Sequence, residues 1–158
     1  MHDDAFIQEV TVTKSKEPVI TLYSDEQLID MKRNCTDKDG SVIGVDRTFN
    51  LGRVFVTATS YKNRSVESNK TGQYPVFLGP LCLHYDAEQS TYHKFFSHLR
   101  DQLNTDELNF GSDDEKALRN AIKTNFPQSG FLLCTKNVKD NIRNYLQQSG
   151  CSQNVREQ

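Results

Sequence analysis

The spacing of apolar and polar residues predicts most of the strands in this chain. Six segments have the composition or the two-residue period of a strand: residues 18–23, 42–45, 53–61, 74–85, 107–111 and 130–134. The run at 42–45 is followed directly by the carboxylate of Asp46, which marks the predicted end of that strand. Gly79 and Pro80 predict a bulge or an edge position in the strand that contains them.

Helical periodicity appears in four other segments. They are residues 24–35, 92–103, 112–126 and 137–150. Ser24 with Gln27, and Ser112 with Glu115, have the spacing of a capping box, so each serine is predicted to begin its helix. Pro127 is predicted to end the third helix.

This order of elements predicts an α/β fold. Three antiparallel strands followed by alternating helices and strands should give a mixed five-stranded sheet with flanking helices. Turn residues at 36–40 predict a boundary between a leader, residues 1–40, and a body, residues 41–150. Residues 151–158 form a polar tail.

Composition and charge narrow the class of protein. The chain has 158 residues, of which 35% are hydrophobic and 25% charged, as in one ordinary globular domain. It has neither an apolar run of the about 18–20 residues that a membrane helix needs nor a secretory signal, which predicts an intracellular protein without a membrane partner. The net charge is −2, but residues 1–40 hold five basic and nine acidic residues, so the body carries +2. The near-neutral total is therefore only weak evidence against a nucleic-acid partner.

Two carboxylates are the strongest candidates for chemistry. Asp46 closes a predicted strand, and Asp113 lies where another strand meets a helix. Carboxylates at neighbouring strand ends can hold the paired divalent metals of phosphoryl transfer. Each residue also has a simpler interpretation, since Asp46 can serve in a turn and an acid in the first turn of a helix is favoured by the helix dipole alone.

Four motifs together resemble one known family. They are Val45-Asp-Arg-Thr-Phe49, Leu78-Gly-Pro80 leading to Tyr92-His-Lys-Phe-Phe96, Ser112-Asp-Asp-Glu-Lys-Ala-Leu118, and Leu132-Leu-Cys134 followed by a basic helix. In order and spacing they resemble the Mutator-like (MULE) transposase domain, a branch of the RNase H-like transposases. The resemblance covers about residues 40–147.

The resemblance implies a DDE-type active site in which three acids hold two Mg²⁺ or Mn²⁺ ions for DNA cleavage and joining. Asp46 would be the first acid and Asp113 the second, with Asp114 as the alternative second acid if the register differs by one. The third acid of the family is a Glu that follows an all-helical insertion. The chain ends at Gln158, about where that insertion is expected, so we expect a partial core and do not assign Glu157 to this role.

The chain departs from the family at one further position. The family has a His three residues after its Cys, whereas Cys134 is followed by Asn137, so we expect structural roles, packing and helix capping, for these two residues. Lys136, Lys139 and Arg143 form one basic edge of the last helix. That edge is either a solvated surface or a contact for DNA phosphates.

The expected function is therefore that of a partial transposase catalytic domain. The resemblance implies DNA, both transposon ends and target, as the partner, a homo-oligomer as the assembly, and the nucleus as the location. Two alternatives stay open. One is a domesticated, catalytically silent descendant that keeps a DNA- or protein-binding surface, and the other is an α/β domain without a nucleic-acid role.

Overall fold

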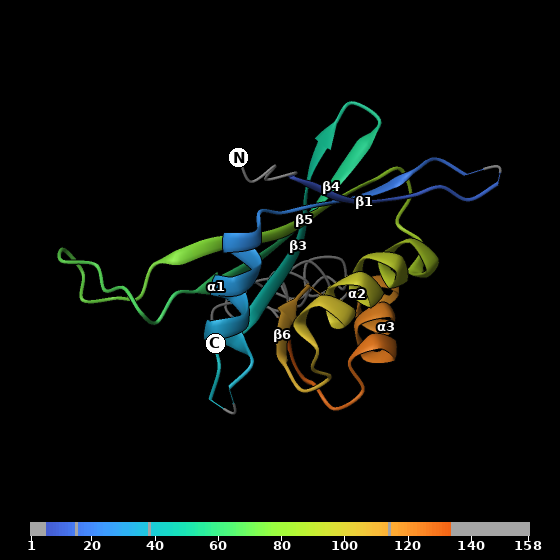
Figure 1. Ribbon diagram of the computed structural model, residues 1–158. Coiled ribbons are helices and arrows are strands. Elements are labelled where there is room, and N and C mark those ends of the chain that lie inside the picture. The colour runs from blue at the N-terminus through green and yellow to red at the C-terminus, as the bar shows by residue number, and fades with distance from the viewer. Residues whose placement is uncertain (1–5, 15, 38, 114, 134–158) are drawn as a thin grey trace, which may run out of the picture.

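The computed structural model describes residues 6–133, with the exception of residues 15, 38 and 114. Within these residues the chain forms seven strands and three helices (Figure 1). In chain order they are β1 (Ile7–Thr11), β2 (Val19–Leu22), α1 (Asp25–Cys35), β3 (Ile43–Leu51), β4 (Val54–Lys62), β5 (Val76–His84), α2 (Gln89–Leu103), β6 (Asn109–Ser112), α3 (Lys116–Asn125) and β7 (Gly130–Leu133). The helix predicted at residues 137–150 and the polar tail lie outside the described residues.

All seven strands belong to one mixed sheet in the order β1-β2-β5-β4-β3-β6-β7. The pairs β1–β2, β2–β5, β5–β4 and β4–β3 are antiparallel, whereas the pairs β3–β6 and β6–β7 are parallel. The α/β class and the mixed sheet are confirmed, but the prediction of five strands is wrong. The two extra strands come from the leader, where β1 was not predicted and β2 pairs with the edge of β5 that the body leaves open.

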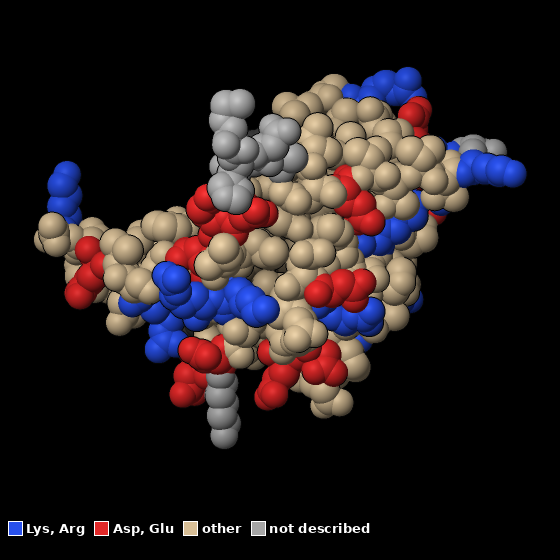
Figure 2. Space-filling view, in the orientation of Figure 1, with Lys and Arg blue, Asp and Glu red and all other residues tan. Residues whose placement is uncertain are grey.

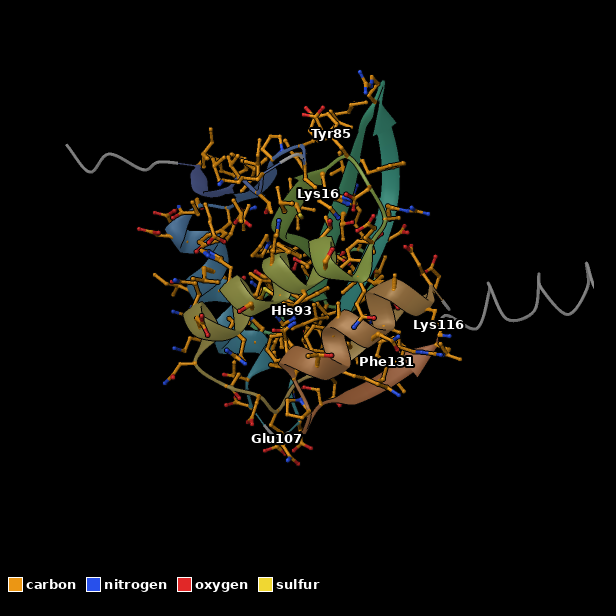
Figure 3. The ribbon with its side chains drawn as sticks, turned by 90° about the vertical axis from the view of Figure 1, so that its right-hand side faces the viewer. Lys16, Tyr85, His93, Glu107, Lys116 and Phe131 are labelled. Atoms are coloured by element: carbon orange, nitrogen blue, oxygen red, sulfur yellow. The ribbon has the colours of Figure 1, made fainter. Side chains whose placement is uncertain are left out.

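The helices cover the same face of the sheet. Thr57 and Tyr61 are both buried on β4, and their spacing places their side chains on one face. Thr57 contacts Tyr92 of α2, and Tyr61 bonds to Asp30 of α1, so both helices lie over that face. Figure 3 shows α2 and α3 packed side by side there. The core under the helices is one cluster that includes Met31, Ile43, Phe96, Phe110, Leu118 and Phe126.

One of the two predicted capping boxes is present. At α1 the Gln27 amide donates to Ser24 Oγ at 3.3 Å, and the Ser24 amide donates to Gln27 Oε1 at 2.9 Å. The box predicted at Ser112 is wrong, because Ser112 is the last residue of β6 and its hydroxyl donates to the carbonyl of Asp113 at 2.8 Å. Helix α3 begins at Lys116, with Glu115 as its N-cap.

The strand that carries Asp46 is longer than predicted. Instead of ending at Asp46, β3 continues to Leu51, because its second half pairs with β4 in a hairpin that turns at Gly52. Gly52 has a φ of +67°, a conformation that glycine adopts without strain.

The predicted bulge at Gly79 and Pro80 is confirmed. Strand β2 pairs with β5 only at Leu81 to Leu83, so this side of β5 is not paired by β2 before Leu81. Ala58 pairs with Leu81 and Ser60 with Leu78, so Thr59 alone lies opposite both residues. Strand β5 itself lies between β2 and β4. A side chain on Gly79 would meet Thr59 Oγ1 at 2.5 Å, so this close approach requires glycine.

Candidate functional site

The pairing of β3 with β6 brings the two candidate aspartates to neighbouring positions in the fold. The strands are parallel and in register, with Gly44 opposite Gly111 and Val45 opposite Ser112. Asp46 and Asp113 are the next residues of the two segments, so they follow at the same level. Neighbouring strands lie about 4.8 Å apart, which makes these two residues neighbours at the carboxyl end of β6.

Both carboxylates are open to solvent to some degree. Val45 is buried and Asp46 is exposed, because successive residues of a strand point to opposite faces. Among the described residues, no hydrogen bond or ion pair engages the Asp46 side chain. Asp113 is half-buried, and within the described residues its Oδ1 accepts one long hydrogen bond, 3.4 Å, from the amide of Glu115. The pair therefore keeps most of its oxygen lone pairs for a ligand.

Among the described residues, the acid nearest to this pair along the chain is already engaged. Glu115 Oε2 lies 3.5 Å from Arg47 Nε, and its Oε1 accepts the hydroxyl proton of Tyr92 at 2.8 Å. The Arg47 guanidinium also lies 5.2 Å above the ring of Phe55. These contacts attach the start of α3 to β3 and so fix the short segment that carries Asp113. Glu115 is a positioning residue in this arrangement.

A buried polar group lies behind this anchor. His84 is fully buried, with Nδ1 at 2.7 Å from the carbonyl of Asp86 and Nε2 at 2.8 Å from Thr57 Oγ1. A carbonyl can only accept, so Nδ1 carries the proton and Nε2 of the neutral ring accepts from Thr57. Burial lowers the pKa of His84 and raises the pKa of Tyr92, whose ring lies 5.3 Å from the imidazole.

Sequence reasoning found the two aspartates but missed these supporting residues. Arg47, Glu115, Tyr92 and His84 come from four elements or their ends, and no short motif joins them. The only sequence signal for these supporting residues was that Arg47 directly follows Asp46 and that Glu115 lies two residues after Asp113.

The donor set fits a hard divalent cation only in part. Carboxylate oxygens are the ligands that Mg²⁺ and Mn²⁺ prefer, and two of them leave most of the coordination shell to water or substrate. Within residues 6–133, as far as they are described, no group of three or more His, Cys, Asp or Glu side chains could hold a metal ion. The other predicted site residues lie outside the described part of the chain: Asp114, Cys134, Lys136, Asn137, Lys139 and Arg143.

Comparison of the chain with protein-family models, with curated proteins and with solved structures found no significant match. Over the described residues, no helix has the length and apolar character to cross a membrane.

Proposed function

We propose that this chain carries part of the catalytic core of a DDE-type transposase of RNase H-like fold, in which Asp46 and Asp113 bind a divalent metal. The parallel register of β3 and β6 carries this proposal, because it makes neighbours of two acids 67 positions apart in the sequence. Five of the strands, in the order β5-β4-β3-β6-β7, also match the arrangement expected from the resemblance, three antiparallel strands followed by α/β alternation.

The described residues would bind and orient the metal without completing the site. If Asp46 and Asp113 held a divalent metal, it would supply activation of water or a DNA 3′-hydroxyl and stabilisation of the charge on the phosphate. Asp46 would supply a ligand from β3, and Asp113 one from the segment that Arg47 and Glu115 attach to β3. The third acid would have to come from outside the described residues. Cleavage and joining of DNA, at transposon ends and target in the nucleus, would belong to the complete active site, with a homo-oligomer as its assembly.

A second candidate function has one specific observation in its favour. Glu115, the described acid closest in sequence to the pair, is held by Arg47 and Tyr92 and is not available as a third ligand. A catalytically silent, transposase-derived module that only binds DNA or protein would need no third ligand. In such a module, phosphate contacts by Lys136, Lys139 and Arg143 would carry the function.

Metal titration tests the proposed site directly. Calorimetry with Mn²⁺ should show weak binding to the wild-type chain, and Asp46→Asn or Asp113→Asn should lower the affinity about tenfold, because each removes a charged ligand. Glu107→Gln is the matched control, because Glu107 is an exposed acid before the opposite end of β6, far from the start of α3 at Lys116 (Figure 3). Equal affinity in all four proteins would refute the site.

A nicking assay separates the two candidate functions. A supercoiled plasmid incubated with Mn²⁺ and a protein that includes this chain and the third acid should be nicked, and Asp46→Asn should abolish the nicking. Metal binding without any Asp46-dependent nicking would favour the silent module. Nicking that persists in Asp46→Asn would refute the assigned role of Asp46.

A further inference from the structure

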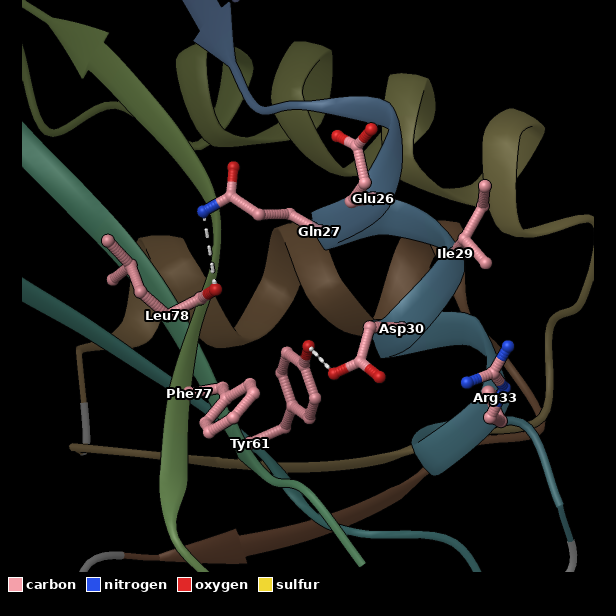
Figure 4. A pocket seen from close by; sticks show the side chains of 8 residues that line it. All are labelled: Glu26, Gln27, Ile29, Asp30, Arg33, Tyr61, Phe77 and Leu78. Carbon is pink, nitrogen blue, oxygen red and sulfur yellow. Dashed lines mark hydrogen bonds between the residues drawn. The ribbon is translucent and has the colours of Figure 1, made fainter. Parts of the chain in front are cut away.

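A second site lies between α1 and β5, on the part of the sheet away from α2 and α3. It is a pocket of about 480 Å³ under α1, between that helix and the first half of β5 (Figure 4). Three apolar side chains around it stay exposed: Ile29 is 57% exposed, Phe77 39% and Leu78 50%. Exposed apolar side chains grouped around one concave surface indicate a binding site more than scattered ones do.

The floor of the pocket is fixed by polar contacts. Tyr61 donates its hydroxyl proton to Asp30 Oδ2 at 2.6 Å, and Asn63 Nδ2 donates to the same oxygen at 2.8 Å. The ring of Phe77 packs edge-on against Tyr61. The Asp30 carboxylate is thus satisfied by the protein itself, so the remaining free surface of the pocket is mainly apolar.

The same pocket borders an open strand edge. Strand β2 pairs with β5 only at Leu81 to Leu83, and the chain then leaves the sheet into α1. The carbonyl of Leu78 points to this open side, where Gln27 Nε2 reaches it at 3.4 Å (Figure 4). Because N–H and C=O of one residue share a side in an antiparallel strand, residues 76 and 78 present pairing groups there.

The two ends of the pocket carry opposite charge. Glu26 lies in the first turn of α1, at the end of the pocket where Gln27 meets Leu78, and Arg33 lies in the last turn, at the level of Phe77 (Figure 4). Neither side chain forms an ion pair with another described residue. Figure 2 shows acidic side chains gathered at one end of α1 and basic ones at the other.

We propose that this groove binds an extended peptide segment of a partner protein, which adds to the open edge of β5 as a strand. An apolar side chain of the peptide would fill the pocket beside Ile29 and Phe77. The peptide would run antiparallel to β5, as β2 and β4 do. In this direction, the peptide residues before the apolar side chain that fills the pocket lie beside Glu26, and the residues after it lie beside Arg33. The recognised segment is therefore basic, then apolar, then acidic.

Two synthetic peptides test the direction and the charge pattern. The probe is fluorescein-labelled Lys-Thr-Val-Leu-Val-Thr-Glu, and its matched control is Glu-Thr-Val-Leu-Val-Thr-Lys, which has the same core with the charges exchanged. Fluorescence anisotropy at low salt should show binding of the probe about fivefold tighter than that of the control. Equal binding of both peptides, or binding of neither, would overturn the proposal.

Protein variants assign the preference to this groove. The double variant Glu26→Lys with Arg33→Glu should reverse the preference between the two peptides, and Ile29→Lys should weaken both about tenfold. Asp101→Lys with Lys123→Glu, on the exposed sides of α2 and α3, is the control and should change neither. Far-ultraviolet circular dichroism checks that each variant is folded. A preference that stays the same in a folded Glu26→Lys, Arg33→Glu protein would refute the groove as the binding site.

Discussion

Asp30 of α1 and Asp46 of β3 are both carboxylates, but they differ in how many protein groups donate hydrogen bonds to them. Asp30 Oδ2 accepts hydrogen bonds from Tyr61 and Asn63, and its Oδ1 lies 3.4 Å from Asn34 Nδ2. Asp46 is exposed and has no hydrogen-bond or ion-pair partner among the described residues. A carboxylate whose oxygens are filled by protein donors stabilises the fold, whereas an open one beside a second acid is available to a ligand.

At the centre of the sheet, the two faces also differ in whether their polar side chains are bonded to other protein groups. Under the helices, Thr57, His84, Tyr92 and Glu115 all bond to one another or to neighbouring residues. On the other face, Asp46 is exposed, and its carboxylate has no hydrogen-bond or ion-pair partner in the part of the chain that the structure describes. The helix-covered face therefore has a structural polar network, whereas Asp46 lies on the opposite face.

The largest effect is expected when Asp30 is removed. Asp30→Ala leaves the hydroxyl of Tyr61 and the amide of Asn63 without their acceptor, which should lower the free energy of unfolding by about 2–3 kcal/mol. Urea denaturation measures this loss. Asp46→Ala is the matched variant and should stay within about 0.5 kcal/mol of the wild type. Equal losses in both variants would contradict the contrast between the two carboxylates.

Removal of Glu115 tests whether it positions the site or binds metal. Glu115→Ala deprives Arg47 of its ion pair and Tyr92 of its acceptor, so we expect a loss of about 1–2 kcal/mol in urea denaturation. Glu115→Gln keeps an acceptor for Tyr92 and should lose less. If Glu115→Gln kept full stability and yet abolished Mn²⁺ binding, Glu115 would be a metal ligand instead of a positioning residue.

A smaller effect is expected from pH, through His84. Burial lowers the pKa of His84 in the folded chain below the usual value of 6.5. Below pH 6.5 the unfolded chain therefore binds a proton at His84 that the folded chain does not. The free energy of unfolding then decreases as the pH is lowered, by at most about 1.4 kcal/mol per pH unit. Above pH 6.5 this contribution is constant.

Denaturation at several pH values between 7 and 5 should show this loss in the wild type. His84→Gln should remove that part of the slope, while His93→Gln, at an exposed position of α2 (Figure 3), should keep it. Identical slopes in the wild type and His84→Gln would show that the buried imidazole does not contribute.

Local sequence patterns predicted most elements but misplaced some of their ends. The two-residue period identified β4, and the apolar stripe identified α2, because both patterns follow from one buried face. Strand β5 was identified by its strand-like composition. Strand β3 exceeded its prediction because pairing with β4 extends it past Asp46. The short edge strand β1 was missed because its apolar residues, such as Ile7 and Val10, are exposed and do not mark a core face.

The candidate site was predictable only at its two acids. The position of Asp113 directly after a strand was predicted from the sequence. The family resemblance indicated both aspartates. The contact of Arg47 with Glu115 and the pocket between α1 and β5 join segments far apart in the chain, so they depend on strand order, which no local pattern specifies. The parallel register of β3 and β6 is a tertiary property of the same kind.

The most direct test of the central claim is paramagnetic broadening by Mn²⁺ in a ¹⁵N-labelled protein. Substoichiometric Mn²⁺ should broaden the amide signals of residues 44–47 and 111–113 first, because the proposed metal site lies between Asp46 and Asp113. In Asp46→Asn the same signals should stay sharp at that Mn²⁺ concentration. Broadening that is centred on other acids, such as Asp37 or Asp101, and that persists in Asp46→Asn would refute the metal site at Asp46 and Asp113.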